Sequence, residues 1–438
     1  MARYLYLPIE EAAREMRARL LLARHALEHG FTVVLGQQWL LSGNLDRMPA
    51  GVVLVKGNNF AQARIMRTAK DAGHAVASIE EEALGLADER EIIRLYDPKV
   101  PSLCDLALTQ GDFQKTCLER RFPEMRGRIV TTGNARADML DRRYMADVLV
   151  DAEELRANHG PYVLVNTNYA SINPREGDTL SYFRLCVDVG VIDPNSERDM
   201  ADFRTWCRWE HENVAAICAA IRTVRDFDSL AKIIVRPHPS ENLEPWNQMV
   251  RGIDGVSVIR EGDHLAWTLG SELLLHTSCT TGLEAFLLDH PVLSLTPGDN
   301  PWHELYAVNH CTPRFTDPKA VANAISRFRA GDQSVRGDRG EALAKLRPHL
   351  IAGDADPAAE RTITALARIA PNQQPSANLT ARDTLREVVR RERHVVKAFV
   401  DLREVRKRFQ SIAAASGWRP STQIQEIGPS LFQLDPPS

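Results

Sequence analysis

The sequence has no pair of cysteines in CxxC spacing and no long apolar run. Its seven cysteines are an odd number, so they indicate neither a disulfide framework nor a structural zinc site. No segment approaches the roughly 18 apolar residues of a membrane span, and acids and arginines interrupt residues 1–27, where a signal peptide needs an apolar stretch. These absences predict a cytoplasmic protein in a reducing compartment.

Neither sign of charge dominates, because 54 Lys and Arg residues stand against 58 Asp and Glu residues. The resulting net charge of -4 gives no reason to expect a nucleic acid partner. The sequence also lacks HExxH, the Walker lysine motif and a Gly-rich dinucleotide fingerprint after the first predicted strand. An Asp-Phe-Asp sequence at 226–228 comes before a predicted strand rather than after one. We therefore expect no metal and no cofactor, and we disfavour metallohydrolase, kinase and dehydrogenase functions.

Short apolar runs alternate with helical patterns along most of the chain, whose composition of 44% hydrophobic and 26% charged residues is typical of a soluble globular protein. This alternation predicts parallel sheets covered on both faces by helices. A first series of predicted strands covers residues 3–9, 31–36, 51–57, 74–79 and 106–111. A second series, after a polar segment, covers residues 162–168, 231–239, 255–260, 271–278 and 290–297.

The two series predict an α/β protein with two tandem Rossmann-like, doubly wound domains that face a cleft. We place the first domain at residues 1–150 and the second at residues 151–370. Ligands are expected where the carboxyl ends of the strands open into that cleft.

Residues 371–438 are predicted to be a linker followed by a helical extension. Within residues 382–408, ten Lys or Arg and five acids give a net charge of +5, and apolar residues keep helical spacing. Such a basic amphipathic helix packs on a domain or a partner subunit, or it contacts an anionic membrane surface. The sequence leaves both possibilities open.

The sequence RPHP, residues 236–239, ends a predicted apolar strand with a histidine between two prolines. The prolines restrict the backbone around His238, and strand ends of such sheets are ligand positions. His238 and Arg236 together suit a phosphate or another oxyanion. The alternative is a surface turn in which the histidine only caps the strand.

A second candidate site lies in LLLHTSCTTGLEAFLLD, residues 273–289, where an apolar strand is followed by small residues and a helix. Hydroxyls and backbone N–H groups at a helix N-terminus form an anion site. Glu284, one turn into the helix, is placed to reach a ribose hydroxyl. The alternative is an ordinary N-cap followed by a packing glycine, Gly282. The candidate phosphate ligands are Ser278, Thr280 and Thr281.

In the first domain, three consecutive acids follow a predicted strand in SIEEEALGL, residues 78–86. Crowded carboxylates raise one another's pKa, which suits a general base that takes a proton from a hydroxyl. Acids are also favoured in the first turn of a helix, so a solvated helix start is the alternative. The acids are Glu80, Glu81 and Glu82.

The order of these motifs, acids, then HP, then a Ser/Thr cluster that opens a helix, resembles bacterial sialyltransferases and Kdo transferases of the GT-B type. The stretches LPIEEAAREMRARLLLARHALEHGFTVVLG and TTGNARADML, at 131–140, look closer still to surface carbohydrate biosynthesis proteins. The resemblance covers roughly residues 3–370. Ala83 follows the acids here, whereas the family's acidic motif normally ends in glycine.

The resemblance implies a metal-independent glycosyltransferase that uses a CMP-linked ulosonic acid, such as Kdo or a sialic-acid-like sugar. It makes Glu81 or Glu82 the base that deprotonates a glycan or lipid-linked glycan acceptor. It makes His238 the group that stabilises or protonates the leaving phosphate, which the hydroxyl cluster holds. Asn166 and Asn168 would complete the donor pocket. Such an enzyme acts in surface polysaccharide assembly, in the cytoplasm or peripherally at the inner membrane.

Other donors and another class of function stay open at this point. UDP-sugars are one alternative, and CDP-polyols are another, because teichoic-acid polymerases carry RxHP-like motifs. The departure at Ala83 allows a non-catalytic protein that binds a sugar nucleotide or serves as a scaffold.

Overall fold

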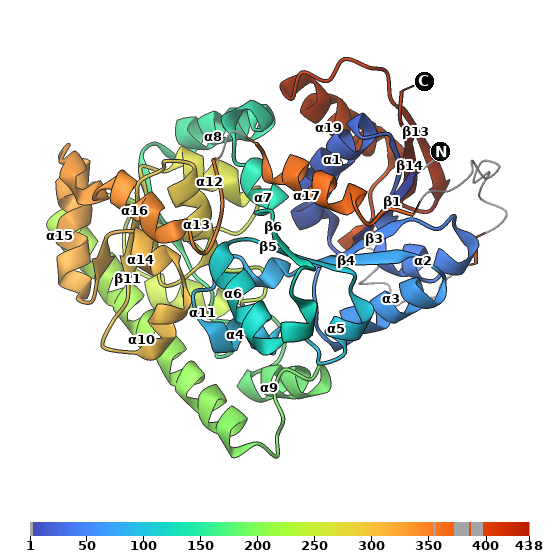
Figure 1. The fold of residues 1–438 in the computed structure, drawn as a ribbon. Coiled ribbons are helices and arrows are strands. Elements are labelled where there is room, and N and C mark those ends of the chain that lie inside the picture. Colours follow the sequence, from blue (N-terminus) through green and yellow to red (C-terminus); the bar gives the residue numbers. More distant parts are fainter. Residues whose placement is uncertain (1–2, 354–355, 372–384, 387–396, 438) are drawn as a thin grey trace. The chain divides into compact units, whose positions relative to one another are not determined.

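The computed structural model describes residues 3–353, 356–371, 385–386 and 397–437. The chain divides into two compact units. Unit 1 comprises Met1–Leu84, Glu89–Tyr144 and Arg347–Ser438, and unit 2 comprises Gly85–Asp88 and Met145–Leu346. Each unit is built on its own largely parallel sheet with flanking helices, as Figure 1 shows, so the predicted α/β class with two Rossmann-like domains is confirmed.

Unit 1 contains an eight-stranded sheet in the order β13-β14-β2-β1-β3-β4-β5-β6. Its strands are β1 (Arg3–Ile9), β2 (Phe31–Gln37), β3 (Val52–Val55), β4 (Ala75–Ile79), β5 (Leu106–Thr109), β6 (Ile129–Thr131), β13 (Gln423–Gly428) and β14 (Leu431–Asp435). The pairs from β2 to β6 are parallel, whereas β14 pairs antiparallel with β2 and with β13. The five strands of the first predicted series are present, and β6, β13 and β14 were not predicted.

Unit 2 contains a six-stranded parallel sheet in the order β12-β11-β10-β7-β8-β9. Its strands are β7 (Tyr162–Asn166), β8 (Lys232–Arg236), β9 (Val256–Val258), β10 (Leu273–His276), β11 (Val292–Leu295) and β12 (Arg314–Phe315). Because β7 lies between β10 and β8, the three strands that end in predicted site residues are neighbours. The short strand β12 was not predicted.

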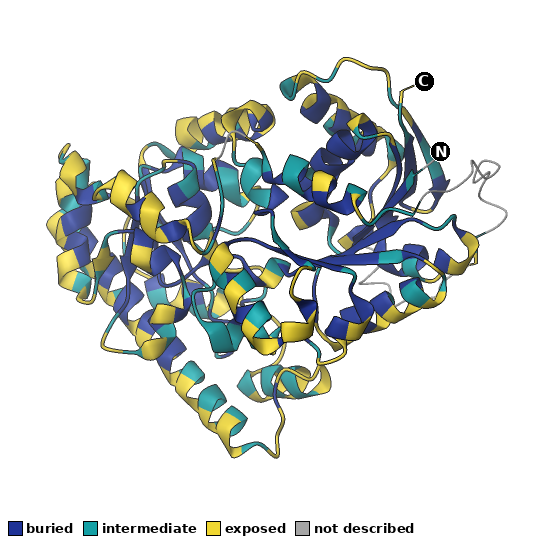
Figure 2. Ribbon diagram, in the orientation of Figure 1, coloured by how far each residue is buried: buried dark blue, intermediate teal, exposed yellow. Residues whose placement is uncertain are grey.

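Helices cover both sheets (Figures 1 and 2). Those of unit 1 are α1 (Ala12–Glu28), α2 (Gln38–Ser42), α3 (Phe60–Asp71), α4 (Glu89–Arg94), α5 (Val100–Leu103), α6 (Asp112–Arg121), α7 (Ala135–Asp138), α17 (Ala358–Ala367) and α19 (Leu402–Ala415). Those of unit 2 are α8 (Ala146–His159), α9 (Thr179–Asp188), α10 (Glu197–Phe227), α11 (Leu243–Val250), α12 (His264–Gly270), α13 (Thr280–Leu287), α14 (Val308–Cys311), α15 (Pro318–Arg329) and α16 (Arg339–Leu346). None of the helices in the described part of the chain combines the length and apolar character that a membrane crossing requires.

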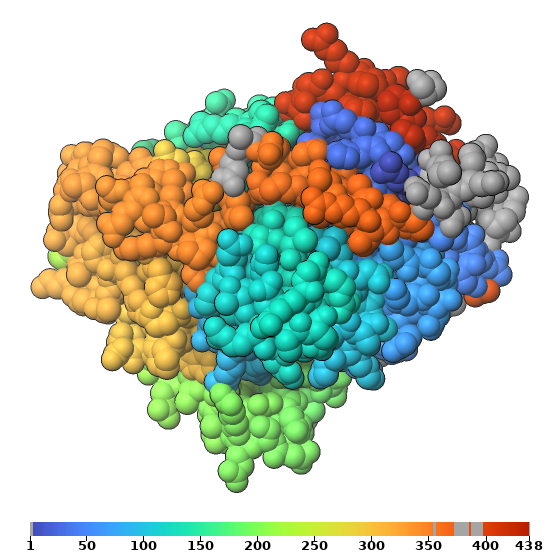
Figure 3. All heavy atoms as spheres, in the orientation of Figure 1, coloured from blue at the N-terminus to red at the C-terminus, as the bar shows by residue number. Residues whose placement is uncertain are grey.

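The end of the chain differs from the prediction, because Arg347–Ser438 belongs to unit 1 instead of forming the end of the second domain and a separate tail. Ile363 and Leu366 of α17 and Phe409 and Ile412 of α19 are buried in the same core as α1. Their apolar stripes need a partner, and α1 supplies one. Figure 3 shows the orange and red segments beside the blue N-terminal residues on the surface.

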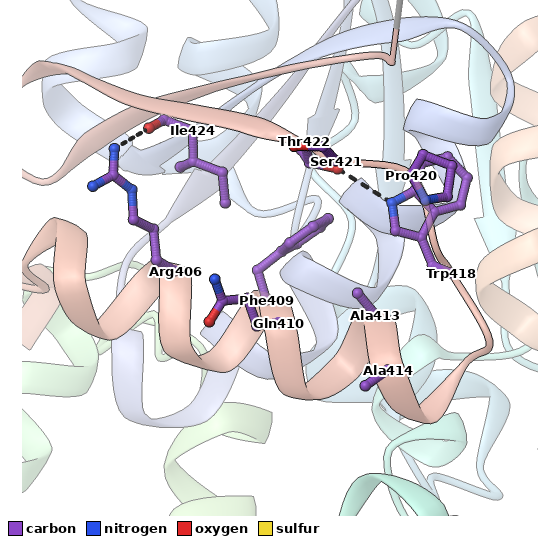
Figure 4. A pocket seen from close by; sticks show the side chains of 10 residues that line it. All are labelled: Arg406, Phe409, Gln410, Ala413, Ala414, Trp418, Pro420, Ser421, Thr422 and Ile424. Carbon is purple, nitrogen blue, oxygen red and sulfur yellow. Dashed lines mark hydrogen bonds between the residues drawn. The ribbon is translucent and has the colours of Figure 1, made fainter.

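The predicted basic helix at 382–408 is only partly within the described residues, which omit 372–384 and 387–396. In the described part, α19 begins at Leu402, and Val405 and Phe409 are buried. For these residues the packing interpretation holds. A pocket of about 320 Å³ remains between α19 and β13 (Figure 4), where Arg406 Nη2 donates to the Ile424 carbonyl at 2.7 Å. None of the residues that line it belongs to a predicted site.

Candidate functional site

The HP loop, residues 236–242, follows β8 and leaves His238 exposed. The backbone N–H of Ser240 donates to Nδ1 of His238 at 3.2 Å, and the Ser240 hydroxyl lies 2.5 Å from the same nitrogen. Because a backbone N–H only donates, Nδ1 carries no proton, and the proton of the neutral ring is on Nε2. The loop therefore sets the tautomer that makes Nε2 a hydrogen-bond donor.

Glu241 is a buried glutamate that holds the HP loop, and it was not among the predicted site residues. One carboxylate oxygen accepts from the backbone N–H of His238 at 2.9 Å and from the hydroxyl of Thr167 at 2.6 Å. The other oxygen accepts from Nε1 of Trp246 at 3.0 Å. Burial raises the pKa of Glu241, and these hydrogen bonds oppose that shift. Glu241 thus joins the loop after β8 to the segment after β7.

Asn166 and Thr281, two predicted donor ligands from different motifs, are in direct contact. Asn166 ends β7, and its Nδ2 donates to the Thr281 hydroxyl at 2.9 Å. Its Oδ1 is buried and has no hydrogen-bond partner among the described residues. Thr280 is exposed at the first position of α13, and Asn168 is half-buried. The loops after β7 and β10 therefore meet, and a shared ligand site there stays a prediction.

Ser278 adopts a left-handed backbone conformation, with φ of 66°, and is buried. Its hydroxyl accepts from Nδ2 of Asn309 at 2.7 Å and lies 3.2 Å from Nδ1 of His303. Positive φ is costly for a non-glycine residue, so this turn is held by its surroundings. In this geometry the Ser278 hydroxyl braces the turn, and its part in phosphate binding stays a prediction.

Arg236 and Glu284 are also engaged within unit 2. The guanidinium of Arg236 donates to the carbonyls of Glu261 and Gly262, at 2.8 and 2.6 Å. Burial lowers the pKa of Arg236 to about 10, although nearby carboxylates oppose this. The Glu284 carboxylate lies 2.9 Å from Nε2 of His264. These contacts brace loops near the site. Direct contacts of either residue with a sugar-nucleotide donor stay predictions.

Gly282 is a packing glycine, as the alternative interpretation of this motif held. A Cβ on Gly282 would lie 2.3 Å from Nε2 of His276, whose ring is fully buried. That ring accepts from the backbone N–H of Cys279 at 3.2 Å, so its Nε2–H donates to the hydroxyl of Ser294 at 3.1 Å. The helix that carries Thr280 and Thr281 is therefore seated directly on a fixed histidine.

In unit 1, the three acids after β4 have different surroundings. Glu80 is buried and accepts from the backbone N–H and the side chain of Asn58, at 2.8 and 3.2 Å. Burial raises the pKa of Glu80 to about 8. Glu81 forms an ion pair with Arg19 at 3.2 Å, and Glu82 is exposed. The carboxyl with the raised pKa is thus the one that caps a turn, and it was not among the predicted catalytic residues.

The two most strongly shifted carboxyls predict a pH dependence of stability. Burial raises the pKa of Glu80 and of Glu210 from 4.5 to about 8, so each keeps in the folded state a proton that the unfolded chain loses. Stability must fall as pH rises through this window, by at most about 1.4 kcal/mol per pH unit for each carboxyl. The buried His276 and His303, with pKa values lowered to about 3 and about 4, act in the opposite direction. The rise in stability with pH that these two histidines cause is complete above a pH of about 6.5.

We therefore expect the urea midpoint to fall between pH 6.5 and pH 8, to be checked by circular dichroism. Glu80 lies in unit 1 and Glu210 in unit 2, so the fall should appear in every resolved transition. A midpoint that is constant or that rises over this range would show that the two carboxyls are ionised in the folded protein.

Comparison with known proteins gives the fold and no closer relationship. No protein-family model and no curated protein matches the sequence. Among solved structures, the chain is similar to UDP-GlcNAc 2-epimerase from Methanocaldococcus jannaschii, at 14% identity and a TM-score of 0.50, over 84% of this chain and 100% of that chain. A putative UDP-N-acetylglucosamine 2-epimerase from Listeria monocytogenes has the same identity and TM-score, over 83% and 94%. The wall teichoic acid polymerase TagF is similar at 9% identity and a TM-score of 0.48, over 84% and 88%. The similarity to the two epimerase structures, each with a TM-score of 0.50, shows the fold alone, which is of the GT-B type.

Proposed function

We propose that the chain is a metal-independent glycosyltransferase of bacterial surface polysaccharide or glycoconjugate assembly, with a CMP-linked ulosonic acid as its donor. One observation carries the proposal. Three segments named in the sequence analysis are joined in unit 2, since Asn166 contacts Thr281 and Glu241 links Thr167 to the HP loop. A site at the carboxyl ends of neighbouring parallel strands is the expected place for a nucleotide.

The hydrogen-bond donors gathered at this site suit a departing phosphate. Nε2 of His238 carries a proton in the neutral ring, and the first N–H groups of α13 lack partners within their own helix. Hydrogen-bond donors that are fixed in place before the reaction stabilise the charge that develops on the leaving group. Glu81 or Glu82 of unit 1 would take the proton of the acceptor hydroxyl. Glu82 is exposed and lies 3.7 Å from Arg14, whereas Glu81 is less exposed and is paired with Arg19.

Two observations favour alternatives. The structures of similar fold include enzymes named for UDP-GlcNAc, so a UDP-sugar is the first competing donor, and a CDP-polyol is the second. The buried acid of the acidic motif, Glu80, caps a turn, which fits a protein that binds a sugar nucleotide without transferring it. The identity of the bound nucleotide distinguishes the candidate sugar donors. A measurement of turnover distinguishes an enzyme from a protein that only binds the sugar nucleotide.

CMP is expected to raise the melting temperature of the full-length protein more than UDP, CDP or GDP does. A ligand that binds only the folded state at about 100 times its Kd stabilises it by about 2.7 kcal/mol. The measurement is a thermal-shift screen, with cytidine as the control, because cytidine lacks the phosphate that α13 and His238 would hold. A larger shift with UDP or CDP would make a UDP-sugar or a CDP-polyol the proposed donor instead. No shift with any nucleotide would refute the transferase proposal.

Peripheral contact with an anionic inner membrane through residues 382–408 is also part of the proposal. Val405 is buried in unit 1, whereas Phe399 is exposed, so in the described part of this segment the contact would combine basic side chains with one apolar side chain. A basic residue near an anionic surface contributes about 1 kcal/mol. Residues 402–435 supply a helix and two strands to unit 1, so charge reversal is a safer test than truncation.

Reversing three exposed bases, Lys397→Glu, Arg403→Glu and Lys407→Glu, should abolish co-sedimentation with anionic vesicles at low salt. A matched control reverses three exposed bases of unit 2, Arg208, Arg251 and Lys319, and should leave co-sedimentation as in the wild type. If the wild-type protein does not pellet with vesicles, or if both triple variants behave alike, the membrane contact is refuted.

A further inference from the structure

Two histidines and a glutamate form a cluster between α1 and α17 in unit 1, away from the motifs described above. His25 lies in the last turn of α1, and His29 follows the helix one turn later. Nδ1 of His25 lies 2.8 Å from one carboxylate oxygen of Glu360, and Nε2 of His29 lies 2.7 Å from the other. We refer to these residues together with Glu28 as the α1–α17 cluster.

Hydrogen bonding within the protein does not satisfy this cluster. Nη1 of Arg24 lies 3.1 Å from Nδ1 of His25, the same nitrogen that faces Glu360. A guanidinium only donates and a carboxylate only accepts, so one ring nitrogen cannot serve both. Nε2 of His25 is buried and has no hydrogen-bond partner among the described residues. Either tautomer of His25 therefore leaves one contact unfavourable, which is the condition that a cation at Nδ1 would relieve.

The geometry matches that of a metal site. Residues four apart at a helix end share one face, so His25 and His29 both reach the Glu360 carboxylate, one at each oxygen. One ligand atom from each of His25, Glu28 and Glu360 lies within 4.8 Å of the others. One imidazole with two carboxylates is a donor set that binds zinc and other first-row transition ions. Glu28 is half exposed, so an ion can reach the cluster from solvent.

We propose that the α1–α17 cluster binds a divalent transition metal ion of the zinc class through Nδ1 of His25 and the carboxylates of Glu28 and Glu360, while His29 orients the Glu360 carboxylate. Nδ1 of His25 and Glu28 become available to the ion when the guanidinium of Arg24, now 3.1 Å from the first and 2.6 Å from the second, turns away. The ion would tie the N-terminal helix to α17, which comes from the returning part of the chain. This site is structural, and it does not depend on the proposed transferase function.

The test is a titration of chelator-treated full-length protein with Zn²⁺, followed by calorimetry, together with Co²⁺ as a spectroscopic probe. We expect one equivalent to bind to the wild type, and His29→Ala and Glu360→Gln to weaken binding by at least about 10-fold, since even groups that only orient metal ligands have effects of this size. The matched control is His310→Ala, which removes a partly exposed histidine of unit 2 and should leave binding unchanged. Bound Co²⁺ should show ligand-field bands without a sulfur-to-metal charge-transfer band.

Three results would overturn the proposal. Zn²⁺ binding that is unchanged in both variants would reduce the cluster to a hydrogen-bonded clamp between two helices. A sulfur-to-cobalt band would place the metal on the free cysteines. Absence of binding in the wild type would exclude the site directly. Circular dichroism of each variant checks folding, and His29→Gln replaces any variant that unfolds, because His29 is less buried than His25.

Discussion

Replacing Gly282 by alanine is expected to lower the free energy of unfolding by about 2–4 kcal/mol, measured by urea denaturation. The added Cβ would lie 2.3 Å from Nε2 of His276 and 2.5 Å from its Cδ2. That ring is buried, and its two nitrogens are bonded to Cys279 and Ser294, so it has no low-energy position to move to. The better helix propensity of alanine, about 1 kcal/mol, offsets only part of this cost.

The matched control is Gly340→Ala, in helix α16 of the same unit. Gly340 is exposed, and a Cβ there would meet only Oδ1 of Asp338, at 3.2 Å. This change should be neutral or slightly stabilising. In a double-mutant cycle with His276→Ala, the cost of Gly282→Ala should shrink, because the ring that it meets is gone. Strictly additive effects would show that the contact with His276 is not the cause.

His238→Ala is expected to lower kcat by about 10²–10⁴-fold while the nucleotide still raises the melting temperature. In the proposed mechanism the exposed ring would serve the leaving group, whereas Glu241 and Thr167 hold the backbone of the loop in either case. Turnover is measured with the sugar nucleotide that corresponds to the best ligand in the thermal-shift screen. His310→Ala, a histidine of unit 2 outside the proposed site, should keep wild-type turnover.

The same assay separates the two roles in catalysis. Either Glu81→Gln or Glu82→Gln should remove transfer and spare donor binding, since the base acts on the acceptor. Near-wild-type turnover in both would exclude these acids as the base, and Glu10, which is paired with Lys56 at 2.9 Å, would become the next candidate. Loss of nucleotide binding in His238→Ala would instead make that residue a binding group.

The core strands of both sheets could be predicted because parallel strands buried on two faces are continuous apolar runs. The strands β1 to β5, β7, β8, β10 and β11 have this character, whereas β9, which was also predicted, is a partly exposed edge strand of three residues. The others do not: β6 has three residues, β12 has two, and β13 reads QIQEIG, with alternating polar residues. A strand that lies at or near a sheet edge and keeps one polar face has a weak apolar signal, so its place in the sheet depends on contacts remote in sequence.

Part of the candidate site was predictable for a similar reason. Asn166, His238 and Thr281 each end or follow an apolar strand, and strand ends of parallel sheets converge. Glu241 gave no such signal, although it lies three residues after His238, because its role depends on Thr167, which is 74 residues away in the chain. Glu80 was named among the three acids but not chosen as the base, because its hydrogen bonds come from Asn58, 22 residues earlier in the chain.

The return of the chain to unit 1 has a consequence for biosynthesis. Unit 2 is nearly continuous, so it can fold on the ribosome once residue 346 has emerged. Unit 1 cannot close its sheet at that time, because the edge of β2 stays open until β14, residues 431–435, has been made. An open strand edge is a site of wrong pairing between chains. Slow or interrupted translation after residue 346 should therefore cause nascent chains to associate through unit 1 rather than through unit 2.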